Sequence, residues 1–93
     1  MAHDDPWRLD YYVDKYEMET GQWLRVGEFL NNDPDGRKNA GMMAQDIFSE
    51  TPGTPVEVTE IWSSVKRGFH DRVIWKNGKW TNQDAAFEGM PDA

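Results

Sequence analysis

The sequence predicts an α+β domain in which an antiparallel sheet of about four to five strands carries one helix on one face. Two strand-like stretches open the chain, a stripe of apolar residues at helical spacing follows, and an Asn-Gly pair lies between strand-like residues near the end. The predicted order is therefore strand, strand, helix, strand, strand, strand. Since 93 residues suit one domain, we expect a single domain over residues 1–82 and a disordered acidic tail at residues 83–93.

The first pair of strands is predicted at residues 7–18 and 23–30, joined by a turn in which Gly21 takes a positive φ. Successive residues of a strand point to opposite faces of the sheet. One face of the first strand is therefore expected to hold Trp7, Leu9, Tyr11 and Val13, and the other face Arg8, Asp10, Tyr12 and Asp14.

A helix is predicted over residues 37–49, where apolar side chains recur three and four positions apart. The stripe consists of Ala40, Met43, Ala44, Ile47 and Phe48. We expect it to cover one face of the sheet, because an apolar stripe needs an apolar partner. Asp35 lies at or near the position that caps the helix, and Pro52 cannot continue it.

The remaining strands are predicted at residues 55–63 and in a hairpin over residues 71–82, with a connection at residues 64–70. Asn77-Gly78 is the preferred pair for a two-residue type I′ turn. In that register Trp75 faces Trp80, so that the two indoles form a stabilising cross-strand pair. Lys76 then faces Lys79.

The composition argues against several classes of protein. The chain has no cysteine, which excludes disulfides, thiolate nucleophiles and thiolate metal sites. The first residues lack the pattern of a secretion signal and no apolar run reaches membrane-spanning length, so we expect a cytoplasmic protein without a membrane partner. A net charge of −7 argues against general affinity for nucleic acid.

No constellation of residues predicts catalysis, and we expect a protein that is not an enzyme and that uses no cofactor. His70 and Asp71 are adjacent, and adjacent strand residues point to opposite faces, where they do not easily act on one proton. Ser49, Ser63 and Ser64 lack the glycine context of a nucleophile elbow.

The loop at residues 31–36 resembles half of a calcium-binding loop. Asn31, Asp33 and Asp35 occupy alternate positions and Gly36 follows them. The position of the closing bidentate carboxylate holds Met42, so no specific metal site is predicted. The alternative is a turn in which Asn and Asp side chains bind local backbone N–H groups and cap the helix.

A protein-binding surface is the leading functional hypothesis. Tyr12 and Tyr16 lie on the strand face that the helix is not expected to cover, with Asp10 and Asp14 beside them. Tyrosines framed by acids are typical of a surface that binds another protein. The alternative for this face is the interface of a homodimer.

Two further functions stay open. The chain could be an acidic inhibitor that imitates nucleic acid, as its net charge allows. It could instead bind nucleic acid locally, because bases stack on aromatic rings while basic side chains meet phosphates. The residues of that second surface would be Lys66, Arg67, Arg72, Trp75, Lys76, Lys79 and Trp80.

Three short motifs carry a resemblance over residues 10–62: a Thr20-Gly21 turn, the stretch VGEF in the second strand, and PVEV at the start of the third. The chain resembles many small uncharacterised proteins of bacteriophages, especially those of actinobacterial hosts, and of those bacteria. The resemblance implies a small accessory protein with no assigned chemistry. If the chain is a phage factor, we expect it to act on a host or phage protein in the host cytoplasm. It implies no functional residue.

Overall fold

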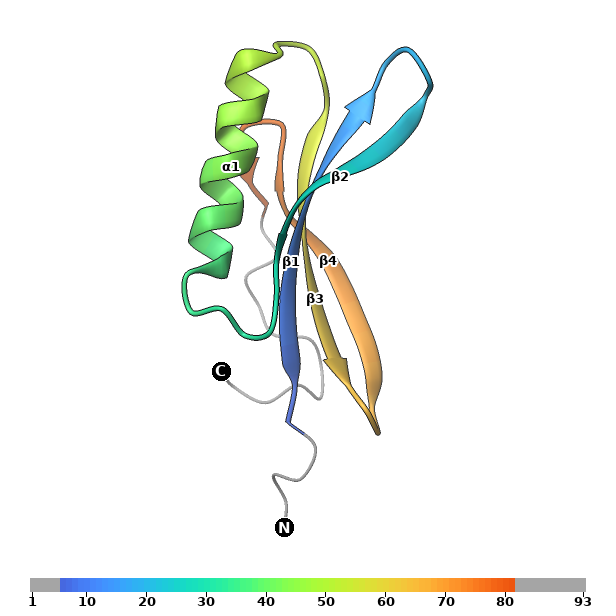
Figure 1. Cartoon of the computed structure of the whole chain (residues 1–93), viewed down its shortest axis with the longest axis vertical. Helices are drawn as coiled ribbons and strands as arrows, with labels where there is room; N and C mark the ends of the chain where they lie inside the picture. Colours follow the sequence, from blue (N-terminus) through green and yellow to red (C-terminus); the bar gives the residue numbers. More distant parts are fainter. Residues whose placement is uncertain (1–5, 82–93) are drawn as a thin grey trace.

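The structure, a computed structural model, describes residues 6–81, which form one five-stranded sheet and one helix (Figure 1). The elements are β1 (Arg8–Glu17), β2 (Gln22–Phe29), α1 (Gly36–Glu50), β3 (Val56–Ser64), β4 (Gly68–Lys76) and β5 (Lys79–Trp80). The strands lie in the order β2-β1-β3-β4-β5, and all neighbours are antiparallel. The predicted fold class and element order are confirmed. The tail predicted at residues 83–93 lies outside the described residues.

The helix packs on one face of the sheet through small residues. Ala40 and Ala44 are fully buried, and Met43, Ile47 and Phe48 pack around them. The sheet side of the core consists of Tyr11, Val13, Val56, Val58, Ile74 and Trp75. The predicted stripe therefore covers the predicted face of β1, and its short side chains let the helix lie close to the strands.

Two β-bulges interrupt the regular pairing, one in β2 opposite Val13 and one in β4 opposite Val58. At the second bulge Ile74 is the extra residue. Both Ile74 and Trp75 are buried in the core, although consecutive residues of a regular strand point to opposite faces. The bulge thus lets β4 supply two large neighbouring side chains to the same core.

The β4–β5 turn has the predicted type I′ form. Asn77 has a φ of 48° and Gly78 a φ of 98°, and Trp75 pairs with Trp80 as expected. Asn77 also joins this turn to β3, because its Oδ1 accepts the Val56 N–H at 2.9 Å while its own N–H donates to the Val56 carbonyl at 3.0 Å. The turn is thereby fixed against the body of the sheet.

Two predicted boundaries need correction. The connection predicted at residues 64–70 is shorter, since β3 continues to Ser64 and β4 begins at Gly68. The Ser64 Oγ accepts the Arg67 N–H at 3.2 Å and Gly68 takes a φ of 81°, which together close a tight turn. The helix begins at Gly36, and Asp35 occupies the capping position without a side-chain hydrogen bond to the helix.

Gly36 permits close contact between the helix start and β1. A Cβ at this position would lie 2.9 Å from the Tyr11 ring, so that any larger residue would have to displace that ring or the helix. Within residues 6–81, no helix has the length and apolar character needed to cross a membrane.

Candidate protein-binding surface

The sheet face turned away from α1, here called the open face, carries the two tyrosines predicted as anchors. Tyr12 and Tyr16 alternate along β1 with residues of the core and are half-buried. The Arg25 guanidinium lies over the Tyr12 ring, 4.0 Å from its centroid, and Trp23 packs edge-on against Tyr16 with 5.4 Å between centroids. Neighbours on β2 therefore hold both tyrosines in place.

A row of charged side chains crosses the open face from β2 to β4. The register places Arg25 beside Asp14, Asp14 beside Glu57, and Glu57 beside Lys76. The Arg25 Nε lies 3.1 Å from Asp14 Oδ1, and the Lys76 Nζ lies 3.8 Å from Glu57 Oε2. Because each carboxylate has a cation beside it, this row does not resemble the unneutralised rows of acids that an imitation of nucleic acid requires.

Asp10 is not one of the exposed acids, which corrects its prediction as part of the tyrosine surface. Its side chain is 7% exposed, lies 3.1 Å from the Arg8 Nε, and accepts the Asn31 N–H at 2.9 Å. The cause is the loop after β2, in which Asn31 and Asn32 take φ values of 62° and 60° and turn the chain back toward β1. There the Asn32 side chain accepts the Leu9 N–H at 2.7 Å.

Two of the calcium-loop candidates bind the local backbone, Asp33 through its side chain and Asp35 through its main-chain carbonyl. Asp33 Oδ1 accepts the Asp35 N–H at 2.9 Å, and Asp35 accepts the Asn39 N–H through its carbonyl. Among residues 6–81, no three His, Cys, Asp or Glu side chains gather in a way that could hold a metal ion. This geometry fits the turn interpretation of Asn31, Asp33 and Asp35.

The end of the β1–β2 hairpin, residues 16–24, projects beyond the rest of the sheet and is here called the hairpin arm. Pairing between β1 and β3 ends at Lys15 and Val56, so the arm is a two-stranded ribbon, and Figure 1 shows its turn lying away from α1. Met18, Trp23 and Leu24 are 64%, 46% and 43% exposed on it. The arm is therefore a two-stranded extension of the sheet that exposes three large apolar side chains.

Met18 and Leu24 were not predicted from the sequence as surface residues. A signal was present, because Trp23, Leu24 and Val26 place apolar side chains at consecutive and alternate positions of one strand. A strand that buries only one face needs polar residues on the other. Exposed apolar residues on both faces of a strand at the edge of a sheet make this strand a candidate interaction surface.

The seven residues of the predicted nucleic-acid surface do not lie together. Trp75 is 2% exposed and cannot stack on a base. The Arg72 side chain is 9% exposed and paired with Glu60. Lys66 belongs to the turn before β4 and Lys76 to the last position of this nine-residue strand, about 30 Å away at about 3.3 Å per residue. The basic residues therefore form separate groups.

A buried polar cluster centres on Glu60, which the helix side of β3 carries into the core. Its Oε1 accepts hydrogen bonds from the Arg72 Nε at 2.8 Å and the Trp62 Nε1 at 2.9 Å, and its Oε2 accepts one from the Tyr11 hydroxyl at 3.0 Å. Both carboxylate oxygens are thus occupied by donors of the same chain. Such a cluster stabilises and orients the sheet.

Burial and the neighbouring Glu60 carboxylate raise the pKa of Tyr11 well above its ordinary value of about 10. Above about pH 10 the unfolded chain loses this proton while the folded chain keeps it, so the free energy of unfolding falls by about 1.4 kcal/mol per pH unit. Tyr11→Phe should remove this fall in unfolding free energy at alkaline pH. At pH 7 the same substitution should lower the free energy of unfolding by about 1.5–3 kcal/mol, because the hydrogen bond to a charged acceptor disappears.

Urea unfolding of both proteins from pH 8 to pH 11 checks this prediction. The difference in unfolding free energy between the parent and the Tyr11→Phe protein should narrow above about pH 10. Two parallel curves would show that Tyr11 ionises equally easily in the folded and unfolded states.

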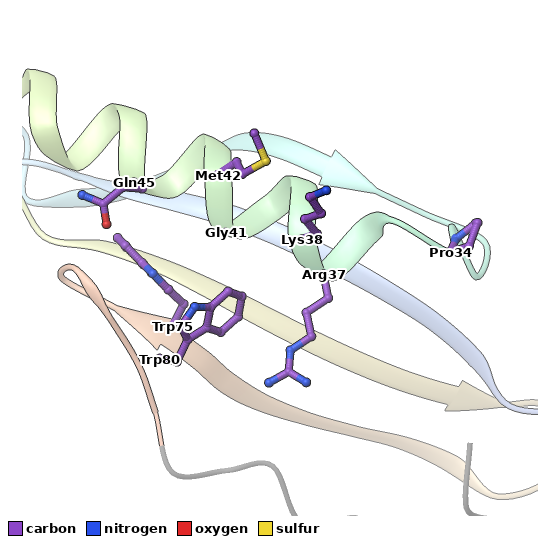
Figure 2. A pocket seen from close by; sticks show the side chains of 8 residues that line it. All are labelled: Pro34, Arg37, Lys38, Gly41, Met42, Gln45, Trp75 and Trp80. Atoms are coloured by element: carbon purple, nitrogen blue, oxygen red, sulfur yellow. The ribbon is translucent and has the colours of Figure 1, made fainter.

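A second candidate site is a groove of about 820 Å³ between α1 and the β4–β5 hairpin (Figure 2). Trp75 and Trp80 come from the hairpin, and the helix side consists of Arg37, Lys38, Gly41, Met42 and Gln45, with Pro34 at one end. The Arg37 guanidinium lies 5.1 Å from the centre of the Trp80 ring. The groove thus combines an apolar surface with two cations and suits an anionic ligand that has apolar parts.

Gly41 shapes this groove. A Cβ at position 41 would lie 2.6 Å from the Trp80 ring, so only glycine lets the indole lie directly against the helix.

Comparison with known proteins adds no candidate function, because no family model, no curated protein and no solved structure matches the chain.

Proposed function

We propose that this protein is a small non-enzymatic binding protein that docks on another protein through the hairpin arm and the adjoining open face. The observation that carries the proposal is the exposure of Met18, Trp23 and Leu24 on one two-stranded ribbon. Exposed apolar residues scattered singly need no explanation, but several on one projecting element are typical of an interaction surface. The ribbon is also at an edge of the sheet, where backbone groups of β2 can pair with a further strand.

The aromatic residues give this surface its anchors. Trp23 and Tyr16 already pack edge-on, and Arg25 already covers Tyr12, so little side-chain freedom is lost when a partner binds. Trp, Tyr and Arg are also the residues that most often dominate binding energy at protein interfaces. The charged pair of Arg25 and Asp14 beside them favours one orientation of the partner.

The resemblance to small phage and actinobacterial proteins suggests the kind of partner and its location. We propose a host or phage protein as the partner and the host cytoplasm as the place of action. Both parts of this proposal rest on the resemblance, whereas the choice of surface rests on the exposed residues of the arm.

The proposal predicts that Trp23→Ser weakens binding at least about tenfold, because truncation of an interface anchor costs about 2 kcal/mol or more. The partner is first captured from host lysate with the full chain and identified by mass spectrometry. Its affinity for purified parent and variant is then measured by calorimetry. Phe69→Ser is the matched control, since Phe69 is an exposed aromatic residue at the start of β4, far along the sheet from the arm.

Two results would overturn this function. If the parent protein sediments as a stable dimer that Trp23→Ser dissociates, the arm closes a homodimer. If the protein binds DNA with an affinity that falls steeply with salt, and Lys76→Ala weakens that binding while Trp23→Ser does not, the protein is a nucleic-acid binder.

A further inference from the structure

The groove between α1 and the β4–β5 hairpin leaves large apolar side chains open to solvent. Met42 on the helix is 57% exposed and Trp80 on the hairpin is 48% exposed, and they line the same groove. Figure 2 shows Arg37 and Lys38 on the helix side of this groove. Its walls therefore offer apolar contact together with positive charge, which favours a ligand that has both apolar and acidic groups.

The path of the chain along the groove points to its occupant. Gly78 lies against Phe48 near the end of α1, and Trp80 lies against Gly41, about two helical turns earlier. The chain therefore runs along the helix toward its start as it leaves the hairpin. Thr81 continues in that direction, held by its N–H at 2.9 Å from the Ile74 carbonyl and its hydroxyl at 2.8 Å from the Val73 carbonyl.

The next turn of α1 in this direction carries Arg37 and Lys38. The next residues of the chain, 82–93, contain three acidic side chains and no basic one. They also contain two large apolar residues, Phe87 and Met90. The described part of the chain thus ends beside a groove with basic and apolar walls, and the segment that follows in the sequence is acidic and contains apolar residues.

We propose that this groove binds the acidic segment 82–93 of the same chain. In this arrangement a carboxylate of the segment meets Arg37 and Lys38, and an apolar side chain of the segment covers Trp80 and Met42. The site lies on the helix side of the sheet and the hairpin arm projects beyond the sheet, so the two proposals can fail independently.

Paramagnetic NMR tests this proposal on the full chain. The protein has no cysteine, so Ala85→Cys provides one attachment point for a nitroxide label. The amide signals of Lys38, Gly41 and Met42 should lose most of their intensity and regain it when the nitroxide is reduced. A label at Thr20→Cys, in the turn of the hairpin arm, is the matched control and should leave those three signals intact.

Reversal of the groove charges tests the electrostatic part. Arg37→Glu with Lys38→Glu should restore the amide signals of Gly41 and Met42 while the label at residue 85 is still oxidised. Lys66→Glu, at the opposite end of β4, should not restore them. If the double variant fails to fold, high salt provides the test instead. In the protein that carries only the label at residue 85, the loss of amide signal intensity at Gly41 and Met42 should be smaller at high salt, because salt screens charges near the surface.

Three results would overturn the proposal. Full intensity at Gly41 and Met42 with the label at residue 85 would show that the segment does not enter the groove. Loss of amide signal intensity at Tyr12 or Trp23, with Gly41 and Met42 unchanged, would assign the segment to the open face. Loss in a mixture of labelled protein and separate ¹⁵N-enriched protein would show that the groove takes the segment of a second copy.

Discussion

Arg72→Ala is expected to lower the free energy of unfolding by about 3–5 kcal/mol, because it removes one partner of a buried ion pair and leaves the other charged. The Glu60 side chain is 4% exposed and cannot recover water in place of the lost guanidinium. Tyr11 and Trp62 remain as donors, but they are neutral groups that satisfy hydrogen bonds without balancing the charge.

Lys76→Ala is the matched control for this loss. The Lys76 side chain is largely exposed, and its Nζ is 3.8 Å from Glu57, so its removal should cost less than about 1 kcal/mol. Urea unfolding at neutral pH measures both variants. In a Glu60→Gln background the cost of Arg72→Ala should fall by about 0.5–3 kcal/mol, the range typical of directly coupled residues. Equal costs for Arg72→Ala and Lys76→Ala would show that the buried pair does not stabilise the sheet.

Half of this buried pair could be predicted from the sequence. Val56 and Val58 alternate on the buried face of β3, and continuing the same alternation places Glu60 on that face. Its partner could not be predicted in the same way. The pairing of Glu60 with Arg72 follows the register set by the tight turn between Ser64 and Gly68, whereas the sequence predicts a longer connection at residues 64–70.

In the fold as a whole, features set by local sequence patterns could be predicted, and features set by contacts between distant segments could not. The Asn77-Gly78 turn and the stripe of α1 are local patterns, and the structure has both where the sequence predicts them. The burial of Asp10 depends on contacts between segments distant in sequence, namely β1 and the loop after β2. Strand alternation places Asp10 on the open face, but it does not show that Asn31 comes back to cover it.

The candidate surface was predictable to a similar extent. Alternation along β1 placed Tyr12 and Tyr16 opposite the core residues. The hairpin arm depends on where β3 begins to pair with β1, and Pro55 immediately before β3 coincides with that limit. The Pro55 carbonyl still accepts the Tyr16 N–H at 2.9 Å, but a proline has no N–H to donate in return, so regular pairing with β3 ends there and the longer β1–β2 hairpin continues alone.

Trp75→Ala should destabilise the protein by about 3–5 kcal/mol, the usual cost of truncating a large aromatic side chain in a core. Trp75 is 2% exposed, and its ring meets Phe48 of α1 edge-on with 6.2 Å between centroids. Its loss leaves a cavity between the helix and β4. Small residues such as Ala44 on the neighbouring part of the helix cannot fill that cavity.

Trp80→Ala is the informative comparison, because Trp80 is the cross-strand partner of Trp75 but is half-exposed. If the indole pair itself were the main contribution of both residues, the two variants would be equally unstable. We expect Trp80→Ala to cost only about 1 kcal/mol, the upper end for one cross-strand pair, since Trp80 covers the groove and does not fill the core. Urea unfolding separates these outcomes. A Trp75→Ala protein as stable as the parent would mean that α1 does not rest on β4 through this indole.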